Sequence, residues 1–398
     1  MYRKTYVEIN LDKLNNNIKN IIKKYDDYKY YIANVKANAY NHGLYVINQM
    51  IESGINYFAV SSLEEAICVR SYNREVGILC TEVIHSEDIK KAINNNITFT
   101  ITSLENLKEL AKLNCKIKVH IKVDTGMNRL GINNREEFND AVSLIEDSKL
   151  YLEGIYTHLA TPGVTDKIYD SQIEKFKEIT KDIDLKTIDI VHIASSFILL
   201  NHPRIKFANG VRIGTMLYGY DISLKEYSDS LKDKILKLRE TLYRKINKNS
   251  KVIRGTKIDL KPCFELKTKI IQIKNIKKGD FVGYGALYQA KKNERIATLE
   301  IGYNDGIGIN TNNRFVIINN KRYPVIGEIS MCMMNVLIDD SVSISDDVYI
   351  IGNGVTLSEM ASINKTSFHN TLVTVGNSLP KIYIKNNKKN NLEDVSCL

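Results

Sequence analysis

A chain of 398 residues suits two domains, and a hydrophobic content of 43% with 23 tyrosines supplies packed cores, which excludes an intrinsically disordered protein. The formal net charge of +10 would suit a nucleic-acid-binding protein, but the lysines are dispersed among asparagines without an arginine-rich stripe, so we expect no nucleic acid partner. The six cysteines include no CxxC pair, which argues against a disulfide framework or a zinc site and predicts a reducing compartment and no metal.

The N-terminal segment has no apolar core of the kind found in a secretory signal, and the chain contains no run of 18 apolar residues. These two observations predict a cytoplasmic protein with no membrane partner.

The first part of the chain alternates short apolar runs with amphipathic helical stretches. Residues 5–10 form the first predicted strand, and residues 11–22 form the first predicted helix. Eight further strands are predicted at residues 31–35, 57–60, 76–80, 97–101, 117–123, 152–156, 188–193 and 205–211, and several stretches between them begin with serine caps. Strands alternating with helices in this way predict an α/β fold with a (β/α)8 TIM-type barrel.

The rest of the chain has a different character. Residues 223–249 are charged, with leucines at helical spacing; a linker helix, a lid and a partner-binding helix remain open, and a solvated insertion is the default interpretation. Beyond residue 257 short β-like runs alternate with Gly and Asn turns, with one short helix predicted at 356–364, which indicates a mainly antiparallel β-domain. The predicted domains are a barrel at 1–235, an inserted helical linker at 236–256 and a C-terminal β-domain at 257–398.

Polar residues follow the predicted barrel strands, at the end of the barrel where active sites lie. Lys36 comes directly after the strand at 31–35, and burial there would lower the pKa of its amine and make it a nucleophile. A surface lysine that extends its charge into water is the alternative interpretation. The other polar residues in equivalent places are Lys122, Arg129, His158, His192, Ser196 and Arg212.

Several segments between Thr5 and Tyr383 resemble the alanine racemase family, in the order in which that family has them. They are VKANAYNHG (35–43), VHIKVDTGMNRLGI (119–132), GIYTHLATPG (154–163), VHIASSF (191–197), GVRIGTMLYG (210–219), FVGYGALY (281–288) and EIGYNDG (300–306). The resemblance implies a racemase that depends on pyridoxal 5′-phosphate, with the cofactor held by Lys36 as a Schiff base. It makes the barrel the cofactor-binding domain.

The resemblance also implies roles for residues around the cofactor. Tyr40 touches the phosphate, and Ser196 binds it together with the backbone amides of Gly214 and Thr215. Arg212 faces the pyridine nitrogen, where a fixed positive charge keeps that nitrogen unprotonated. His158 belongs to a hydrogen-bonded chain that tunes a catalytic tyrosine.

On the substrate side, the resemblance makes Tyr284 the base opposite Lys36. Arg129 faces the substrate carboxylate, and Met331 offers its backbone amide to the same group. Lys122 occupies a position that the family commonly carbamylates, and Tyr303 approaches the site.

The sequence departs from the family pattern mainly on this substrate side. Cys332 stands in place of an aspartate, and His369 stands in place of a tyrosine that helps bound the pocket. Asn41 and Asn128 replace glycines, and asparagine is a residue that tolerates positive φ. Cys332 and His369, with Tyr303, are therefore candidates for setting the substrate.

The implied activity is the interconversion of L-alanine and D-alanine by two-base α-proton exchange on the cofactor aldimine, which supplies D-alanine for peptidoglycan. The implied assembly is a homodimer with shared active sites. A racemase of the same mechanism acting on serine, or on a larger or basic amino acid, is the main alternative. A barrel-type decarboxylase and a non-catalytic cofactor-binding paralogue are the alternatives from other classes.

Overall fold

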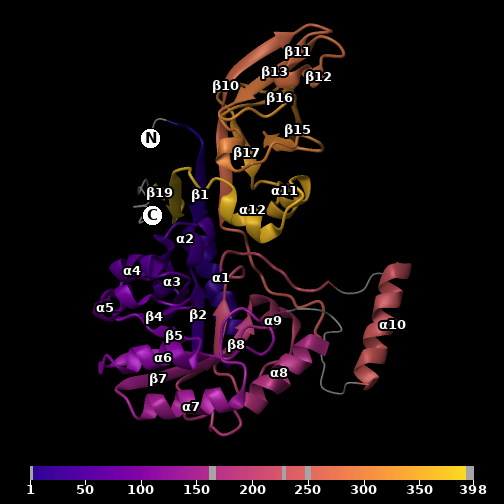
Figure 1. Ribbon diagram of the computed structural model, residues 1–398. Helices are drawn as coiled ribbons and strands as arrows, with labels where there is room; N and C mark the ends of the chain where they lie inside the picture. Colours follow the sequence, from indigo (N-terminus) through magenta and orange to yellow (C-terminus); the bar gives the residue numbers. More distant parts are fainter. Residues whose placement is uncertain (1–2, 161–166, 226–229, 247–251, 391–398) are drawn as a thin grey trace. The chain divides into compact units, whose positions relative to one another are not determined.

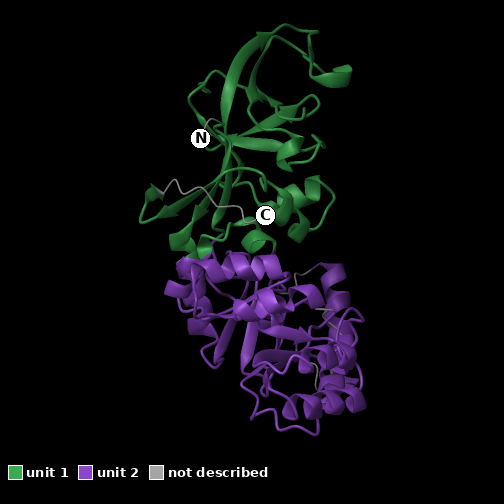
Figure 2. Ribbon diagram, turned by 60° about the vertical axis from the view of Figure 1, so that its left-hand side comes forward, with its two compact units in different colours: residues 1–14, 37–46, 262–396 green, residues 15–36, 47–261, 397–398 purple. Residues whose placement is uncertain are grey.

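A computed structural model describes residues 3–160, 167–225, 230–246 and 252–390 (Figure 1). The chain divides into two compact units, each built from segments that are distant in sequence (Figure 2). Of the described residues, unit 1 contains those within 3–14, 37–46 and 262–390, and unit 2 contains those within 15–36 and 47–261. The boundary inside the VKANAYNHG segment falls directly after Lys36.

Unit 2 contains an eight-stranded parallel sheet that closes on itself. Its strands, in spatial order, are β4 (Gly77–Cys80), β3 (Tyr57–Val60), β2 (Tyr30–Asn34), β9 (Gly210–Ile213), β8 (Ile190–Ser195), β7 (Leu150–Tyr156), β6 (Ile117–Lys122) and β5 (Phe99–Ile101). A parallel bridge between Leu79 and Thr98 joins the two ends of this order. The (β/α)8 barrel prediction is therefore confirmed.

The helices associated with this barrel range from 6 to 16 residues in length. They are α1 (Leu11–Lys24), α3 (Val46–Glu52), α4 (Leu63–Tyr72), α5 (Ile89–Asn94), α6 (Leu104–Ala111), α7 (Arg135–Glu146), α8 (Lys167–Ile179), α9 (Ser196–Asn201) and α10 (Leu231–Ile246). The predicted serine caps are present: Ser62 and Ser103 accept hydrogen bonds from the third residue of α4 and of α6, respectively.

The last barrel strand begins at Gly210, later than the predicted range of 205–211. Asn209 explains the difference, because its side chain accepts a hydrogen bond from Val191 N (2.8 Å) and donates one to Asp189 O (2.9 Å). Its carbonyl oxygen accepts a hydrogen bond from Lys29 N at 2.9 Å. These hydrogen bonds join Asn209 to the start of β8 and to the segment that leads into β2, so regular β-pairing of β9 starts only at the next residue.

Unit 1 contains, among the described residues, a nine-stranded and mostly antiparallel sheet. Its order is β13 (Glu294–Leu299), β16 (Met334–Ile338), β15 (Lys321–Ile326), β14 (Phe315–Ile318), β17 (Asp347–Ile351), β10 (Phe264–Ile276), β1 (Tyr6–Asn10), β18 (Lys381–Lys385) and β19 (Lys388–Asn390). The long strand β10 also pairs with β13, which closes the first six strands into a barrel. The predicted antiparallel β-domain is confirmed, and β1 shows that the N-terminal strand pairs with it.

Three smaller features complete unit 1. A hairpin of β11 (Phe281–Val282) and β12 (Tyr288–Gln289) encloses the turn η2 (Tyr284–Ala286), and a second turn, η3, spans Tyr303–Asp305. Two helices, α11 (Leu357–Ile363) and α12 (Phe368–Thr374), follow β17. The prediction of a single helix here was wrong. The second helix, α12, is capped by Ser367, but the polar residues before Leu372 give it little helical pattern in the sequence. None of the described helices is long and apolar enough to cross a membrane.

Candidate active site

Arg212 lies at the centre of a group of polar side chains in the barrel of unit 2. It belongs to β9 and is 4% exposed. Its guanidinium donates to the backbone oxygens of His192 (2.9 Å) and Thr157 (2.7 Å). It also approaches two imidazole nitrogens, Nδ1 of His192 at 2.8 Å and Nδ1 of His158 at 3.1 Å. The positive charge is thus held by carbonyl oxygens and imidazoles.

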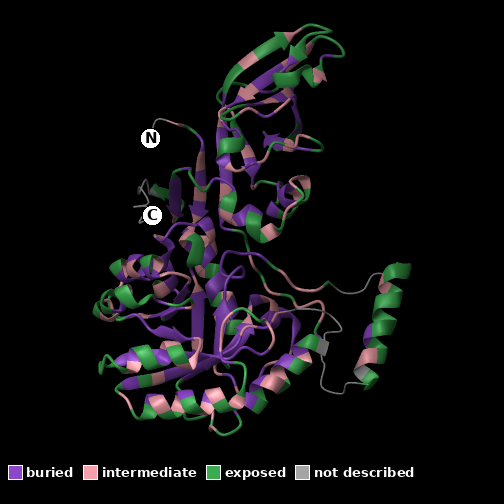
Figure 3. Cartoon of the chain, in the orientation of Figure 1, coloured by how far each residue is buried: buried purple, intermediate pink, exposed green. Residues whose placement is uncertain are grey.

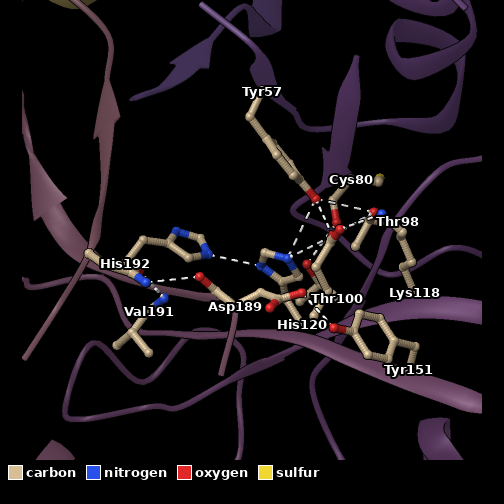
Figure 4. Close-up of polar contacts among 12 residues, drawn as sticks. Tyr57, Cys80, Thr98, Thr100, Lys118, His120, Tyr151, Asp189, Val191 and His192 are labelled. Carbon is tan, nitrogen blue, oxygen red and sulfur yellow. Dashed lines mark hydrogen bonds and ion pairs between the residues drawn. The ribbon is translucent and has the colours of Figure 1, made fainter. Parts of the chain in front are cut away.

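A chain of hydrogen bonds continues from His192 through the barrel interior. Nε2 of His192 lies 2.9 Å from Nδ1 of His120, and Nε2 of His120 lies 3.2 Å from Oε2 of Glu153 (Figure 4). Because a guanidinium can only donate, His192 Nδ1 must accept, and its proton must sit on Nε2. His192 Nε2 therefore donates a hydrogen bond to His120 Nδ1. The proton of His120 must then sit on Nε2, which donates to Glu153. Arg212 alone therefore fixes the tautomer of both neutral imidazoles.

The electrostatics agree with neutral imidazoles. Burial lowers the pKa of His192 well below its usual value, and the positive charge of Arg212 adds to the effect. Burial likewise lowers the pKa of His120, and it lowers the pKa of His158 to about 3 with help from Arg212. Burial opposes ionisation of Glu153, but hydrogen bonds from His120 and other donors outweigh it and lower the pKa of Glu153 to about 2. This series of hydrogen bonds therefore has a cation, Arg212, at one end and a carboxylate, Glu153, at the other.

The carboxylate end is fully engaged with donors. Tyr57 donates to Oε2 of Glu153 at 2.6 Å, and Lys118 binds Oε1 at 2.6 Å. Thr98 donates to Oε2 at 3.2 Å. Figure 4 shows Tyr57, Thr98 and Lys118 converging on this point beside His120.

Lys122 brings a second cation near Arg212. It is the last residue of β6 and is 6% exposed, with its ammonium 5.9 Å from the ring centroid of Tyr156. Burial lowers the pKa of Lys122 to about 8, and Arg129 and Arg212 contribute to the shift. A substantial fraction of the amine is therefore neutral near pH 8 and able to react with an acid or with carbon dioxide.

The loop that carries Arg129 is shaped by Asp124. Its Oδ1 accepts hydrogen bonds from the amides of Gly126, Met127 and Asn128 at 2.9–3.1 Å. Asn128 has φ of 54°, so the asparagine adopts the left-handed conformation that a glycine would. Arg129 itself is exposed.

Ser196, Gly214 and Thr215 also gather in unit 2. The amide of Gly214 donates to Ser196 Oγ at 2.9 Å, at the first turn of α9. Both Ser196 and Thr215 are buried. Lys36 follows β2 by two residues, and its side chain is exposed. Its charge contributes to the lowered pKa of His158, so the two side chains are close enough to interact.

The cofactor-motif segment after Lys36 belongs to unit 1 and is left-handed. In α2 (Lys36–Asn41), the residues Ala37–Tyr40 all have φ of 52–53°, and Asn41 has φ of 67°. The Asn41 amide nitrogen donates to the oxygens of Leu372 (3.1 Å) and Val375 (2.7 Å) at the end of α12. Asn41 therefore adopts the positive φ expected of it, and it also binds the helix that carries His369.

The other predicted site residues lie in unit 1 and are exposed there. They are Tyr284, Tyr303, Met331, Cys332 and His369. Backbone hydrogen bonds join two of their loops: Tyr303 N donates to Ser330 O, and Asn304 N donates to Met331 O. A Cβ atom at Gly302 would lie 2.2 Å from Ser330 O, so this contact requires glycine. Tyr284 is 70% exposed.

Most of this hydrogen-bonded series was not predicted from the sequence. His192 was expected near the site by its position alone, without a role, and His120 and Glu153 were not expected there. Gly154 was the available signal, because a glycine within a strand marks a close approach. A Cβ at Gly154 would lie 2.5 Å from the His120 ring. No group of His, Cys, Asp and Glu side chains in the described parts of the chain could hold a metal ion.

Comparisons with known proteins agree over nearly the full length of the chain. The sequence models of the alanine racemase N-terminal and C-terminal domains match residues 9–222 and 263–383. The chain is 33% identical to alanine racemase 2 of Caldanaerobacter subterraneus subsp. tengcongensis, over 96% of this chain and 95% of that protein. It is 31% identical to alanine racemase of Streptococcus agalactiae, over 96% and 99%.

Solved structures give the same result. The alanine racemase of Clostridium difficile superposes with a TM-score of 0.84 at 29% identity, with 98% of each chain covered. The histidine racemase of Leuconostoc mesenteroides shares the fold, with a TM-score of 0.80 at 24% identity, covering 96% of this chain and 99% of that one. The chain therefore belongs to the alanine racemase family of pyridoxal-phosphate-dependent amino-acid racemases.

Proposed function

We propose that this protein interconverts L-alanine and D-alanine in the cytoplasm and supplies D-alanine for cell-wall peptidoglycan. The observation that carries the proposal is the buried Arg212 held between two neutral imidazoles. Family membership supports the reaction class, and the retention of Lys36, Arg129 and Tyr284 supports activity. The domain roles follow: the barrel binds the cofactor, and the C-terminal β-domain supplies substrate-side groups.

The residues of unit 2 fit pyridoxal 5′-phosphate. Lys36 offers an exposed amine at the end of β2, and the buried Ser196 offers a hydroxyl beside Gly214 and Thr215 for the phosphate. Tyr40 is the further phosphate contact that the family pattern assigns. When bound, the cofactor supplies the electron sink that makes the α-proton of an amino acid removable.

Arg212 sets the electronic character of that site. Burial lowers its pKa to about 10, which leaves the guanidinium charged at neutral pH. With the cofactor bound, the fixed charge of Arg212 would disfavour protonation of the cofactor's ring nitrogen. The hydrogen bond to His192 Nδ1 keeps the guanidinium in one orientation, and the low pKa of His158 keeps its imidazole uncharged. This arrangement favours proton exchange at one carbon over side reactions.

Two proton carriers are needed for inversion. Lys36 removes the α-proton from one enantiomer and Tyr284 removes it from the other, and the opposite residue returns a proton. Tyr284 is 70% exposed in a single chain, where water would compete for its proton. We therefore propose a homodimer in which the β-domain of one subunit completes the site of the other.

Arg129 and the Met331 amide bind the substrate carboxylate in this proposal, and Lys122 acts as a carbamate that orients Arg129. A second substrate class is favoured by Cys332 and His369, which replace an aspartate and a tyrosine of the family pattern. A racemase for serine, or for a larger or basic amino acid, is therefore the alternative.

The test is deuterium incorporation at the α-carbon from D2O for a panel of single amino acids, followed by chiral analysis. Exchange with inversion for alanine supports the proposal, and exchange for serine, lysine or arginine but not alanine supports the alternative. Lys36→Ala should abolish exchange, and Tyr284→Phe should slow it selectively for one enantiomer. Tyr349, in β17 of unit 1, is not among the predicted site residues, so Tyr349→Phe is the matched control and should leave exchange unchanged. Bound cofactor without exchange of any amino acid would refute both readings.

The shared sites can be tested by mixing the two variants and measuring racemisation, which each variant alone should lack because it retains only one of the two proton carriers. If each site uses Lys36 of one subunit and Tyr284 of the other, a mixed dimer of Lys36→Ala and Tyr284→Phe contains one intact site. Random reassortment then restores about a quarter of the wild-type activity. No recovery after subunit exchange, shown by mass-tagged subunits, would place both residues in the same chain's site.

A further inference from the structure

The helix α10 carries an apolar face that is turned away from the rest of the described chain. Five side chains form this face, each between 51% and 80% exposed: Leu231, Ile235, Leu238, Leu242 and Ile246. Leu236, which is 37% exposed, lies off the face. At 3.6 residues per turn these positions fall on one stripe along the helix. Figure 3 shows α10 coloured as exposed along most of its length.

The opposite side of α10 is held by polar contacts. Glu240 is buried and lies 3.2 Å from Arg254, and Tyr243 donates to Asp170 of α8 at 3.1 Å. On the helical wheel, Glu240 lies directly opposite the stripe. These contacts orient the helix so that the apolar face looks outward.

The charges on α10 are sorted about the stripe. Lys232 and Arg239 flank it on one side, and Lys234 and Lys245 flank it on the other. All four side chains are exposed. The acidic Asp233 and Glu240 both lie on the opposite half of the helix, together with Lys237. The stripe is therefore bordered on both sides by cations.

This sorting decides what the face can bind. In a pair of identical helices packed through the stripe, the flanking positions would bring lysines and arginines of the two copies together, and like charges at these positions disfavour pairing. An apolar stripe bordered by cations instead complements a partner that offers an apolar region next to negative charges. An anionic phospholipid bilayer has this structure, with acyl chains beneath charged headgroups.

We propose that α10 is an interfacial helix that docks the protein onto anionic phospholipid membranes. The stripe enters the boundary between headgroups and acyl chains, and the flanking lysines and arginine extend to lipid phosphates. The helix lies between the two matched family domains, so the function is an addition to the racemase reaction and independent of it. It departs from the sequence-based expectation of no membrane partner.

The experiment is flotation of the full-length protein with vesicles, in low salt and in high salt. Binding to vesicles that contain phosphatidylglycerol, with little binding to pure phosphatidylcholine, is the expected result, and high salt should weaken it. Leu238→Glu should reduce binding to the level of neutral vesicles. Lys232→Ala and Arg239→Ala should each weaken binding about fivefold, the contribution of one basic side chain near such a surface.

Lys237→Ala is the matched control, because Lys237 is an exposed lysine of the same helix that lies away from the stripe. It should weaken binding less than Lys232→Ala. All of these variants should retain the thermal stability and amino-acid exchange of the wild type. Equal binding to neutral and anionic vesicles, or none to either, would overturn the proposal. So would a Leu238→Glu variant that loses self-association in sedimentation but keeps vesicle binding, since the stripe would then be a contact between copies.

Discussion

Replacing Lys122 by methionine is expected to stabilise the protein, although Lys122 lies within a family motif. The side chain is buried at the end of β6, and among the described residues it forms no hydrogen bond or ion pair. Burial is the main cause that lowers its pKa from 10.5 to about 8. Methionine has a similar length and no charge, so it fills the same space without the desolvation penalty.

The magnitude follows from the pKa. A decrease from 10.5 to about 8 corresponds to about 3 kcal/mol of unfavourable free energy for the charged form in the folded state. That cost is fully present below pH 8, where the folded and unfolded states both carry the proton. It disappears between pH 8 and pH 10.5, because there the unfolded state binds more protons and stability rises with pH. Relaxation around the ammonium reduces the measured gain, so we expect about 1–3 kcal/mol at neutral pH.

The assay is urea unfolding of wild type and Lys122→Met in carbonate-free buffer, from neutral pH to above pH 10. Lys118→Met is the matched control on the same strand. Its ammonium binds the buried Glu153 at 2.6 Å, so its removal should destabilise the protein. Bicarbonate should stabilise the wild type and leave Lys122→Met unchanged if the amine is carbamylated. A Lys122→Met variant that is less stable than wild type at neutral pH, or a difference that does not shrink towards pH 10, would refute the reasoning.

Two further predictions concern Asn41 and Glu153. Asn41→Gly keeps the positive φ but loses the hydrogen bonds to Leu372 and Val375. We expect the free energy of unfolding, measured with urea, to fall by about 1–2 kcal/mol. An unchanged free energy of unfolding would show that water replaces both bonds. Glu153→Gln should remove an acid-sensitive part of the stability. Hydrogen bonds to Glu153 outweigh the effect of burial and lower its pKa from 4.5 to about 2. The wild type should therefore lose stability as the pH falls from 4.5 towards 2, whereas the variant should not. Identical dependence of the unfolding free energy on pH in the two proteins would contradict the prediction.

The sequence was sufficient for the architecture because that information is local and periodic. Buried parallel strands are continuous apolar runs, and the helices between them start at Ser62 and Ser103, whose caps the structure shows. The family motifs were likewise readable because their residues are contiguous. Where local signals were weak, the prediction failed: α12 was missed, and β9 was placed too early because the hydrogen bonds of Asn209 are long-range.

Other features were decided only by the tertiary structure, because they join residues that are distant in sequence. The Glu153–His120–His192–Arg212 chain runs across β6 to β9, and no spacing in the sequence shows that these four side chains meet. The contact of Asn41 with the end of α12 spans most of the chain. The outward direction of the α10 stripe was also decided by the tertiary structure. The periodicity of α10 predicts an apolar face, but only the burial of Glu240 beside Arg254 shows that the opposite face is the one covered by the protein.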